Sequence, residues 1–472
     1  MLFNSWQFAV FLPIVFALYW TVPKTYRWAV LTVSGYVFYM FGGAKYVILL
    51  ALVTLVTYFG AIGIEQNKSQ ARMILLGTLL FNFGILFVYK YFNFFSVSLM
   101  SLFRGEGFTL DLVLPAGISF YTFGTAAYVI DVYQGKMKPL HHLGLYAAYV
   151  SYFPKLLAGP IERIQPFIRQ LRGADSFSYE DGMYGVYQMV WGLFKKMVIA
   201  DTLAKYVNLV YGDVHGYGGG ALLAASVMYM IQIYCDFSGY SDIAMGVSRL
   251  FGIRLSDNFL HPYSAVSIQD FWRRWHISLS SWVRDYLYIP LGGNRKGKLR
   301  TYLNTVIVFM VSGLWHGAAW TYIFWGLIHG IAQVFERILN RGKKREVRGF
   351  ARVLCHLGVW VFLLITWIFF RADTLSDAFY VLTHLFSGIV SPVSYAYRAY
   401  SQLGIDSYTL LCIPYMLLCL LVFEVLASKK DPLLRLSEMG PKKRFVLCLF
   451  FMFMFLMVLP VRSSNEFLYF RF

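Results

Sequence analysis

Two histidines stand in surroundings that favour acid–base chemistry. His316 lies in the run Ser312–Gly317 (SGLWHG), within an apolar stretch that begins near Tyr302. A polar side chain is costly inside a membrane span and usually faces a cavity or a partner, so His316 is a functional candidate. Imidazole titrates near pH ~6.5 and can therefore take a proton from a hydroxyl group near neutral pH. The alternative interpretation is a structural histidine that is hydrogen-bonded between two helices.

The second histidine, His276, lies in a segment where aromatic and charged residues alternate. Residues 270–286 read DFWRRWHISLSSWVRDY and hold three tryptophans and three arginines. As a helix, the segment would pair Asp270 with Arg274 at positions i and i+4. Arginines are expensive in lipid, so the segment must lie at the membrane interface or line a polar cavity. An aromatic anchor at the headgroups would explain the tryptophans, but such an anchor does not need the histidine.

The sequence lacks the patterns of several other catalytic chemistries. It has neither a Gly-x-Ser-x-Gly nucleophile elbow nor a Gly-x-x-x-x-Gly-Lys-Ser/Thr phosphate loop. The other histidines lack metal-ligand spacing and the five cysteines show no Cys-x-x-Cys pair, so we predict no metal site. We expect His329, 13 residues beyond His316, to have a packing role. Histidine base chemistry is what remains.

The elements that position these residues must be membrane helices. Of the 472 residues, 58% are hydrophobic and only 14% are charged, and the mean hydropathy is +0.56. Soluble domains carry about a quarter charged residues, whereas a membrane-spanning helix needs about 20 mostly apolar ones. We therefore predict an all-α polytopic membrane protein with ~10 to 12 crossings. No linker, low-complexity tract or repeat interrupts the chain, which predicts a single domain over residues 1–472.

The net charge of +18 does not indicate nucleic-acid binding. The basic residues gather in short loops between apolar runs, as the positive-inside rule requires of cytoplasmic loops, and no basic soluble domain is present. The partner is the lipid bilayer. The loops that we assign to the cytoplasm are 24–27, 68–72, 163–172, 294–300, 341–348 and 429–444.

The same rule gives an orientation. The first basic residues, Lys24 and Arg27, follow the first apolar run, which predicts an N-terminus outside the cytoplasm. The stretch 373–407 is poor in basic residues and is expected to be external. If Arg300 marks the cytoplasmic boundary, His316 lies ~24 Å further along a helix, deep in the bilayer or toward its outer leaflet.

Several long runs resemble the bacterial branch of the membrane-bound O-acyltransferase family, and within it the members that acetylate alginate, peptidoglycan or cellulose. The likeness extends from near the start of the chain to about residue 373. The runs that carry it are residues 114–123 (LPAGISFYTF), 157–160 (LAGP), 234–242 (YCDFSGYSD), 271–280 (FWRRWHISLS), 284–295 (RDYLYIPLGGNR), 314–318 (LWHGA) and 369–373 (FFRAD).

The resemblance implies a ring of tilted helices around a tunnel that joins the two faces of a bacterial cytoplasmic membrane. It also implies acetyl-CoA as co-substrate without a further cofactor, an extracytoplasmic polysaccharide as acceptor, and a partner protein of the SGNH hydrolase type. His316 matches the family's catalytic histidine, and His276 matches a second, more variable polar position. On this basis His316 is the general base or a transient acyl carrier, while His276 hydrogen-bonds the thioester carbonyl or orients His316.

Further residues receive roles within this expectation. Those expected to line the substrate tunnel are Trp275, Trp315, Gly317, Tyr234 and Asp236. Those that could contact the phosphates of the donor are Arg273, Arg274, Arg295 and Lys296, although ordinary positive-inside charge explains them equally well.

Two other functions remain open from the sequence. One is D-alanyl transfer to teichoic acid from a carrier-protein thioester, against which the run YIPLGGNR favours the acetyltransferase branch. The other, from a different class, is a transporter or flippase with polar residues along its path, which often shows paired halves with interrupted helices. No such internal similarity is visible here.

Overall fold

The structure, a computed structural model, describes residues 1–173, 176–339, 348–428, 431–440, 442–446 and 449. These residues form helices joined by loops, and they contain one isolated antiparallel bridge, between Phe259 and Trp275. The predicted all-α fold class is confirmed. Two of the loops assigned to the cytoplasm, 341–348 and 429–444, lie wholly or partly outside the described residues.

The chain divides into two compact units. Unit 1 comprises residues 1–189 and 241–257, and unit 2 comprises residues 190–240 and 258–472. The chain passes from unit 1 to unit 2 within α10, returns to unit 1 within α12, and passes to unit 2 again after residue 257. The expected single domain therefore stays a prediction.

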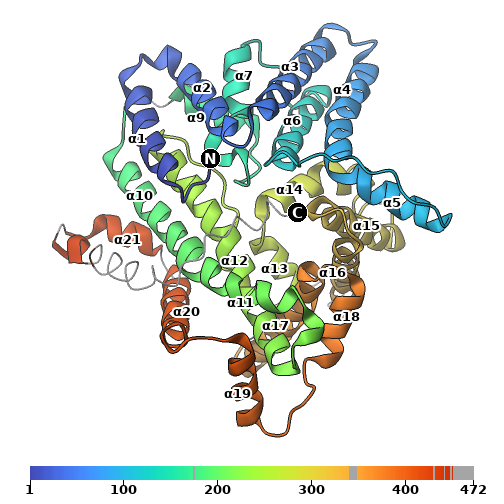
Figure 1. The fold of residues 1–472 in the computed structure, drawn as a ribbon. Coiled ribbons are helices and arrows are strands. Elements are labelled where there is room, and N and C mark those ends of the chain that lie inside the picture. The colour runs from blue at the N-terminus through green and yellow to red at the C-terminus, as the bar shows by residue number, and fades with distance from the viewer. Residues whose placement is uncertain (174–175, 340–347, 429–430, 441, 447–448, 450–472) are drawn as a thin grey trace. The chain divides into compact units, whose positions relative to one another are not determined.

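Unit 1 is built from the N-terminal helices (Figure 1). They are α1 (Trp6–Thr21), α2 (Arg27–Met40), α3 (Ala44–Gln66), α4 (Ala71–Leu86), α5 (Phe92–Leu102), α6 (Ile118–Tyr133), α7 (Leu143–Val150), α8 (Phe153–Leu156), α9 (Ile164–Gly173) and most of α10 (Tyr179–Leu193).

Unit 2 holds both candidate histidines and the C-terminal helices. They are α11 (Asp201–Tyr211), most of α12 (Gly219–Leu250), α13 (Ile268–Arg274), α14 (Ile277–Val283), α15 (Lys298–His316), α16 (Trp320–Leu339), α17 (Phe350–Arg371), α18 (Leu375–His384), α19 (Pro392–Leu403), α20 (Ser407–Ala427) and α21 (Pro432–Glu438). A π-helical segment, η3 (Phe194–Ala200), joins α10 to α11.

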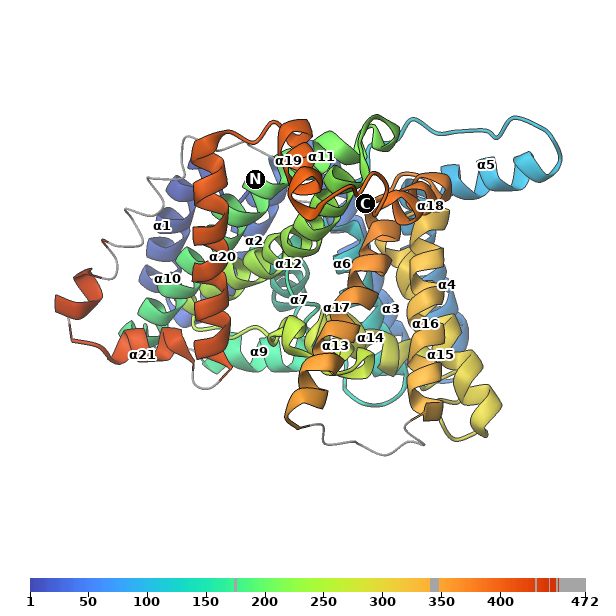
Figure 2. The same cartoon turned by 90° about the horizontal axis from the view of Figure 1, so that it is seen from below.

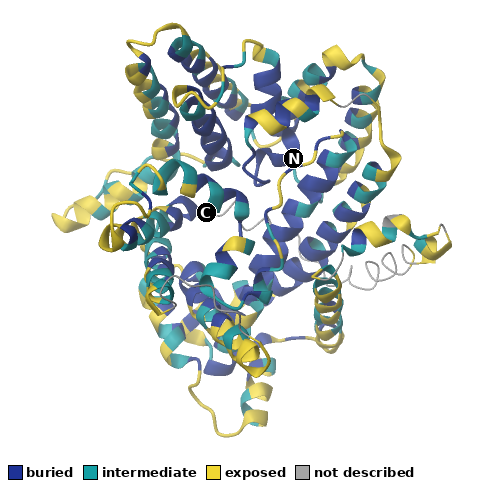
Figure 3. Cartoon of the chain, turned by 180° about the vertical axis from the view of Figure 1, so that it is seen from behind, coloured by how far each residue is buried: buried dark blue, intermediate teal, exposed yellow. Residues whose placement is uncertain are grey.

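Five helical segments of the described chain are long and apolar enough to cross a membrane: α3, α4 together with α5, α12, α17 and α20. Several other apolar runs form shorter helices, such as α2 and α6, and α15 and α16 are long enough but less apolar. The expected number of crossings therefore stays a prediction. The five segments differ widely in burial (Figure 3). In the apolar part of α12, 72% of the residues are buried, whereas in the apolar part of α20 only 11% are buried.

The helices α15 and α16 form an antiparallel hairpin that fixes His316 (Figure 2). Glycines bring the two backbones into contact, as small residues do between membrane helices. A Cβ atom on Gly313 would lie 2.2 Å from the Tyr322 carbonyl oxygen, and one on Gly326 would lie 2.3 Å from that of Phe309. The glycines on both helices are therefore required for this packing.

Candidate active site

His316 is the last residue of α15, so the unbroken helix from Lys298 carries it away from the basic loop as the sequence predicts. The chain then turns at Gly317, and α16 returns alongside. The His316 side chain is 2% exposed. Its ring packs against aromatic rings from three helices, with centroid distances of 5.0 Å to Trp315, 5.4 Å to Trp325 and 5.3 Å to Phe370.

His276 lies at a break between two short helices and not inside one long helix. It adopts the left-handed conformation with φ 46°, and α14 starts at the next residue. The break is stabilised by the preceding chain: Leu260 N–H donates to the Arg274 carbonyl at 2.9 Å, and Ile277 N–H donates to the Asn258 carbonyl at 3.0 Å. These bonds turn His276 inward, and its side chain is 0% exposed.

The structure brings the two predicted histidines together. The ring centroids of His276 and His316 are 6.2 Å apart. An imidazole nitrogen lies about 1.2 Å from its ring centre, so facing nitrogens would stand about 4 Å apart, slightly too far for a direct hydrogen bond. An oxygen atom to the side of the line that joins these nitrogens can lie about 2.8 Å from both. The pair thus has the spacing needed to hold a hydroxyl group between two imidazoles.

Tryptophans surround the pair. Trp315 lies 5.8 Å from His276, and beyond His316 the stacked rings of Trp325 and Trp367 are 5.9 Å apart. Trp275 packs 5.1 Å from Trp367 and is 1% exposed. This enclosure excludes water from the histidines, which strengthens electrostatic interactions between them and any bound group.

Burial lowers the pKa of His276, which lies outside the five candidate spans, to about 3. In the unfolded chain the His276 imidazole becomes protonated as the pH falls below ~6.5. In the folded protein it stays neutral down to about pH 3. Stability therefore falls as the pH drops below ~6.5, by up to about 1.4 kcal/mol per pH unit. We expect His276→Gln to make this dependence shallower between pH 6.5 and 4, measured as unfolding in denaturant at each pH. An unchanged slope would show that His276 is accessible to protons in the folded state.

The predicted tunnel residue Gly317 meets a side chain of its own hairpin. Its backbone is extended, and an added Cβ atom would lie 2.1 Å from the ring of Tyr322. That ring packs 4.9 Å from Phe370, which in turn contacts His316. The glycine is therefore needed for close packing behind the histidine.

Gly317→Ala is expected to destabilise the protein by about 1–3 kcal/mol, because an extra methyl group in a packed site forces its neighbours to move. The apparent melting temperature in detergent measures this effect. Gly358→Ala in α17 is the matched control, since a Cβ atom there has no neighbour within 4 Å. Tyr322→Leu should restore part of the lost stability in the Gly317→Ala background. A melting temperature for Gly317→Ala equal to that of the control would contradict the packing role.

Asp236 and Tyr234, also predicted to line the tunnel, make buried polar contacts. Asp236 is 2.6 Å from the ammonium group of Lys196, which also contacts Asp201 at 2.8 Å. All three side chains are at most 8% exposed. The Tyr234 hydroxyl donates to a carboxylate oxygen of Glu424 at 2.5 Å, and the Tyr234 ring lies 6.2 Å from that of Trp275. Their role in a tunnel stays a prediction.

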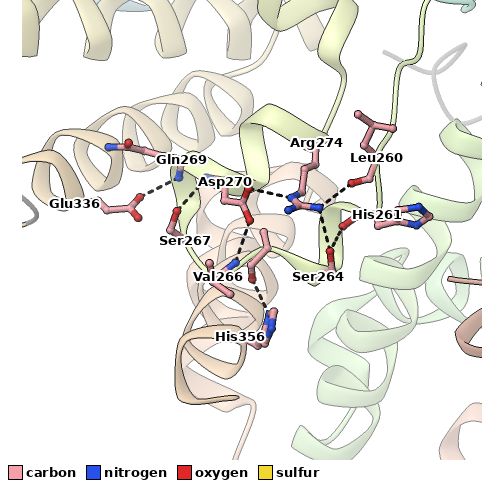
Figure 4. Close-up of polar contacts among 11 residues, drawn as sticks. Leu260, His261, Ser264, Val266, Ser267, Gln269, Asp270, Arg274, Glu336 and His356 are labelled. Atoms are coloured by element: carbon pink, nitrogen blue, oxygen red, sulfur yellow. Dashed lines mark hydrogen bonds and ion pairs between the residues drawn. The ribbon is translucent and has the colours of Figure 1, made fainter. Parts of the chain in front are cut away.

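The four residues predicted to contact the phosphates of the donor are not equally free to bind a ligand. Arg274 forms the predicted i,i+4 ion pair with Asp270 at 3.0 Å and donates to Ser264 and to the Leu260 carbonyl (Figure 4). Its guanidinium is therefore already used to hold the loop before α13. The other three, Arg273, Arg295 and Lys296, are exposed.

Sequence reasoning missed two groups of residues. Asn258 is 1% exposed, and its side-chain oxygen lies 3.1 Å from Nδ1 of His276. Glu424 in α20 binds Tyr234 and also approaches His261 Nδ1 at 2.5 Å, although the C-terminal part of the chain has no recognisable motif. The signal in the sequence was a lone carboxylate within an otherwise apolar helix.

His329 lies on α16, within the same tryptophan cluster as His316. It is fully buried, and its Nδ1 accepts a hydrogen bond of 3.1 Å from the indole N–H of Trp272. Its ring is 4.8 Å from that of Trp325. These contacts agree with the packing role that we expect for it.

Comparison with known proteins gives the class. The family model of the membrane-bound O-acyltransferase family matches residues 139–375, which include both histidines. The chain is 40% identical to the probable alginate O-acetylase of Pseudomonas aeruginosa over 401 residues, covering 82% of this chain and 75% of the relative. It is 36% identical to the peptidoglycan O-acetyltransferase of Helicobacter pylori over 420 residues, covering 81% and 79%.

A more distant similarity covers half of the chain. The teichoic acid D-alanyltransferase of Bacillus subtilis is 31% identical over 249 residues, which is 50% of this chain and 62% of the relative. The chain belongs to the membrane-bound O-acyltransferase family. It is an enzyme, an O-acetyltransferase of that family, and the resemblance stated from the sequence is confirmed.

Proposed function

We propose that the enzyme transfers an acetyl group from cytoplasmic acetyl-CoA across the membrane to a hydroxyl group of an extracytoplasmic polysaccharide. The observation that carries this proposal is the buried pair of imidazoles, His276 and His316, 6.2 Å apart within a wall of tryptophans. The relatives named for alginate and peptidoglycan O-acetylation support the acetyl group and the polysaccharide acceptor.

The chemistry needs one proton acceptor near the reacting hydroxyl. His316 takes the hydroxyl proton while the oxygen attacks the thioester carbonyl carbon and a C–O bond forms. When the tetrahedral intermediate collapses, the C–S bond breaks and the sulfur leaves as a thiol with that proton. In a two-step version His316 carries the acetyl group transiently before it reaches the hydroxyl. Trp275 and Trp315 exclude water, which would otherwise hydrolyse the thioester.

The surroundings of the site complete the proposal. The exposed cations Arg273, Arg295 and Lys296 are the better candidates for the phosphates of CoA, because Arg274 is held by Asp270. We place the enzyme in the cytoplasmic membrane of a bacterium with its N-terminus outside. An SGNH-type partner then accepts the acetyl group or presents the polymer, and no further cofactor takes part.

The test uses the purified protein in lipid nanodiscs with radiolabelled acetyl-CoA. Release of CoA is measured, and the label is followed on the enzyme, on a co-expressed SGNH-type partner and on polysaccharide. Release of CoA with label on the partner or polymer supports the proposal. Intact acetyl-CoA in the presence of both acceptors would show that acetyl-CoA is not the donor.

A second candidate function is D-alanyl transfer, which the similarity to teichoic acid D-alanyltransferases favours. The same preparation is incubated with a D-alanyl thioester of a carrier protein. Consumption of this thioester, with acetyl-CoA left intact, would replace the acetyl donor in the proposal. The histidine pair serves either donor, because both reactions attack a thioester carbonyl.

A further inference from the structure

Three hydrogen bonds meet at one atom of Asn258. Its Oδ1 lies 3.3 Å from the backbone nitrogen of Ser278, 2.9 Å from the Ser278 hydroxyl and 3.1 Å from Nδ1 of His276. A backbone N–H can only donate, so the atom of the Asn258 amide that faces it must be the carbonyl oxygen. The Nδ1 atom of His276 faces the same oxygen and must therefore carry a proton.

The protonation of Nδ1 determines what the other ring nitrogen can do. Burial lowers the pKa of His276 to about 3, so its imidazole is neutral at physiological pH. A neutral imidazole has one N–H and one lone pair. With the hydrogen on Nδ1, the lone pair is on Nε2, and Nε2 accepts a hydrogen bond but cannot donate one.

We infer that Asn258 is a positioning residue, which fixes His276 in the tautomer whose Nε2 accepts a hydrogen bond. This inference rests on the proposed function and refines it. A thioester carbonyl offers only acceptor atoms, so His276 does not stabilise it by donating a hydrogen bond. The partner of Nε2 is a donor, so Nε2 accepts the O–H of the incoming hydroxyl group before that proton passes to His316.

The surrounding backbone holds the arrangement in place. The backbone of Asn258 also binds this turn, since its carbonyl oxygen accepts from Ile277 N–H at 3.0 Å. The left-handed conformation of His276, with φ 46°, is strained for a residue other than glycine. Such a conformation persists only where the surrounding contacts fix it, and here those contacts come from Asn258 and Leu260.

The test compares three variants in the acetyl-CoA assay. Asn258→Leu removes the acceptor oxygen at similar volume and is expected to lower kcat by about 100-fold or more, with KM changed less than about threefold, because the wrong tautomer is then allowed. Asn258→Asp keeps an acceptor oxygen and is expected to recover kcat to within about tenfold of wild type. Ser278→Ala is the matched control. The Ser278 backbone N–H still donates to Oδ1 of Asn258 and keeps the amide oxygen facing His276, so activity should change less than about threefold.

Folding is checked by the apparent melting temperature of each variant, and Asn258→Ala replaces Asn258→Leu if the larger side chain prevents folding. A folded variant without the oxygen that keeps wild-type kcat would overturn the inference. So would an Asn258→Asp variant as inactive as Asn258→Leu. If the wild type itself does not consume acetyl-CoA, the donor in the proposed function fails instead, and the variants are then compared on the D-alanyl thioester.

Discussion

Replacing His316 by alanine is expected to lower the rate of CoA release by about a thousandfold, without preventing folding. A positioned general base contributes about 10²–10⁴-fold to the rate. His276, whose ring centroid is 6.2 Å from that of His316, would have to replace it from a different position. Single-turnover release of CoA from labelled acetyl-CoA measures the effect, and the melting temperature in detergent reports the fold.

The matched control is His329→Ala, because His329 is equally buried in the same tryptophan cluster. This change leaves the indole N–H of Trp272 without its acceptor and should cost about 1–3 kcal/mol of stability. In the protein that stays folded, kcat should remain within about tenfold of wild type. Equal losses of activity in the two variants would indicate that His316 has a packing role and that the catalytic assignment is wrong.

The largest loss of stability is expected from Lys196→Met. The Lys196 ammonium group lies between the carboxylates of Asp201 and Asp236, at 2.8 and 2.6 Å, and all three are nearly inaccessible to solvent. Removal of one partner from a buried ionic group costs about 3–5 kcal/mol, because the remaining charges are left buried without compensation. The apparent melting temperature and the yield of folded protein in detergent measure this loss.

Lys136→Met is the control for the loss of a lysine in an ion pair. Lys136 is 53% exposed and 3.5 Å from Asp131, and a surface pair of this kind contributes about 0–1 kcal/mol. Changing Asp201 and Asp236 to asparagine together with Lys196→Met should recover part of the stability, since neither carboxylate then carries a buried charge. If Lys196→Met melts at the temperature of the control, Asp236 is not a structural carboxylate, and its predicted role in the tunnel gains support.

The composition was enough to predict the fold class. The pair His276 and His316 was predicted from the two histidine segments together with the family resemblance, and its catalytic role stays a prediction. A histidine in an apolar helix and a second one among arginines both cost free energy in a membrane. Such residues are therefore functional candidates even before their neighbours in space are known. A helix that carries His316 away from the basic loop also followed from the apolar run that begins near Tyr302, whereas the turn after His316 did not follow from the sequence.

The break at Trp275–His276 could not be predicted, because helical spacing holds on both sides of it. Asp270 and Arg274 do pair as in a helix, yet the hydrogen bonds that end α13 come from residues 258–260, far from the local pattern. The packing role of Gly317 could not be predicted either, because the ring that leaves no room for a Cβ atom at this position belongs to Tyr322 on the next helix. Local periodicity contains no information about contacts of this kind.

The contacts of Glu424 restrict how the C-terminal helix can change during evolution or engineering. A helix as exposed and apolar as α20 would ordinarily be exchangeable between relatives, since lipid-facing surfaces tolerate many apolar sequences. Here one turn of it provides the carboxylate shared by Tyr234 and His261. A chimaera with a foreign α20 that lacks this acid would leave both groups to find new partners, so positions 234, 261 and 424 should be inherited together as a set.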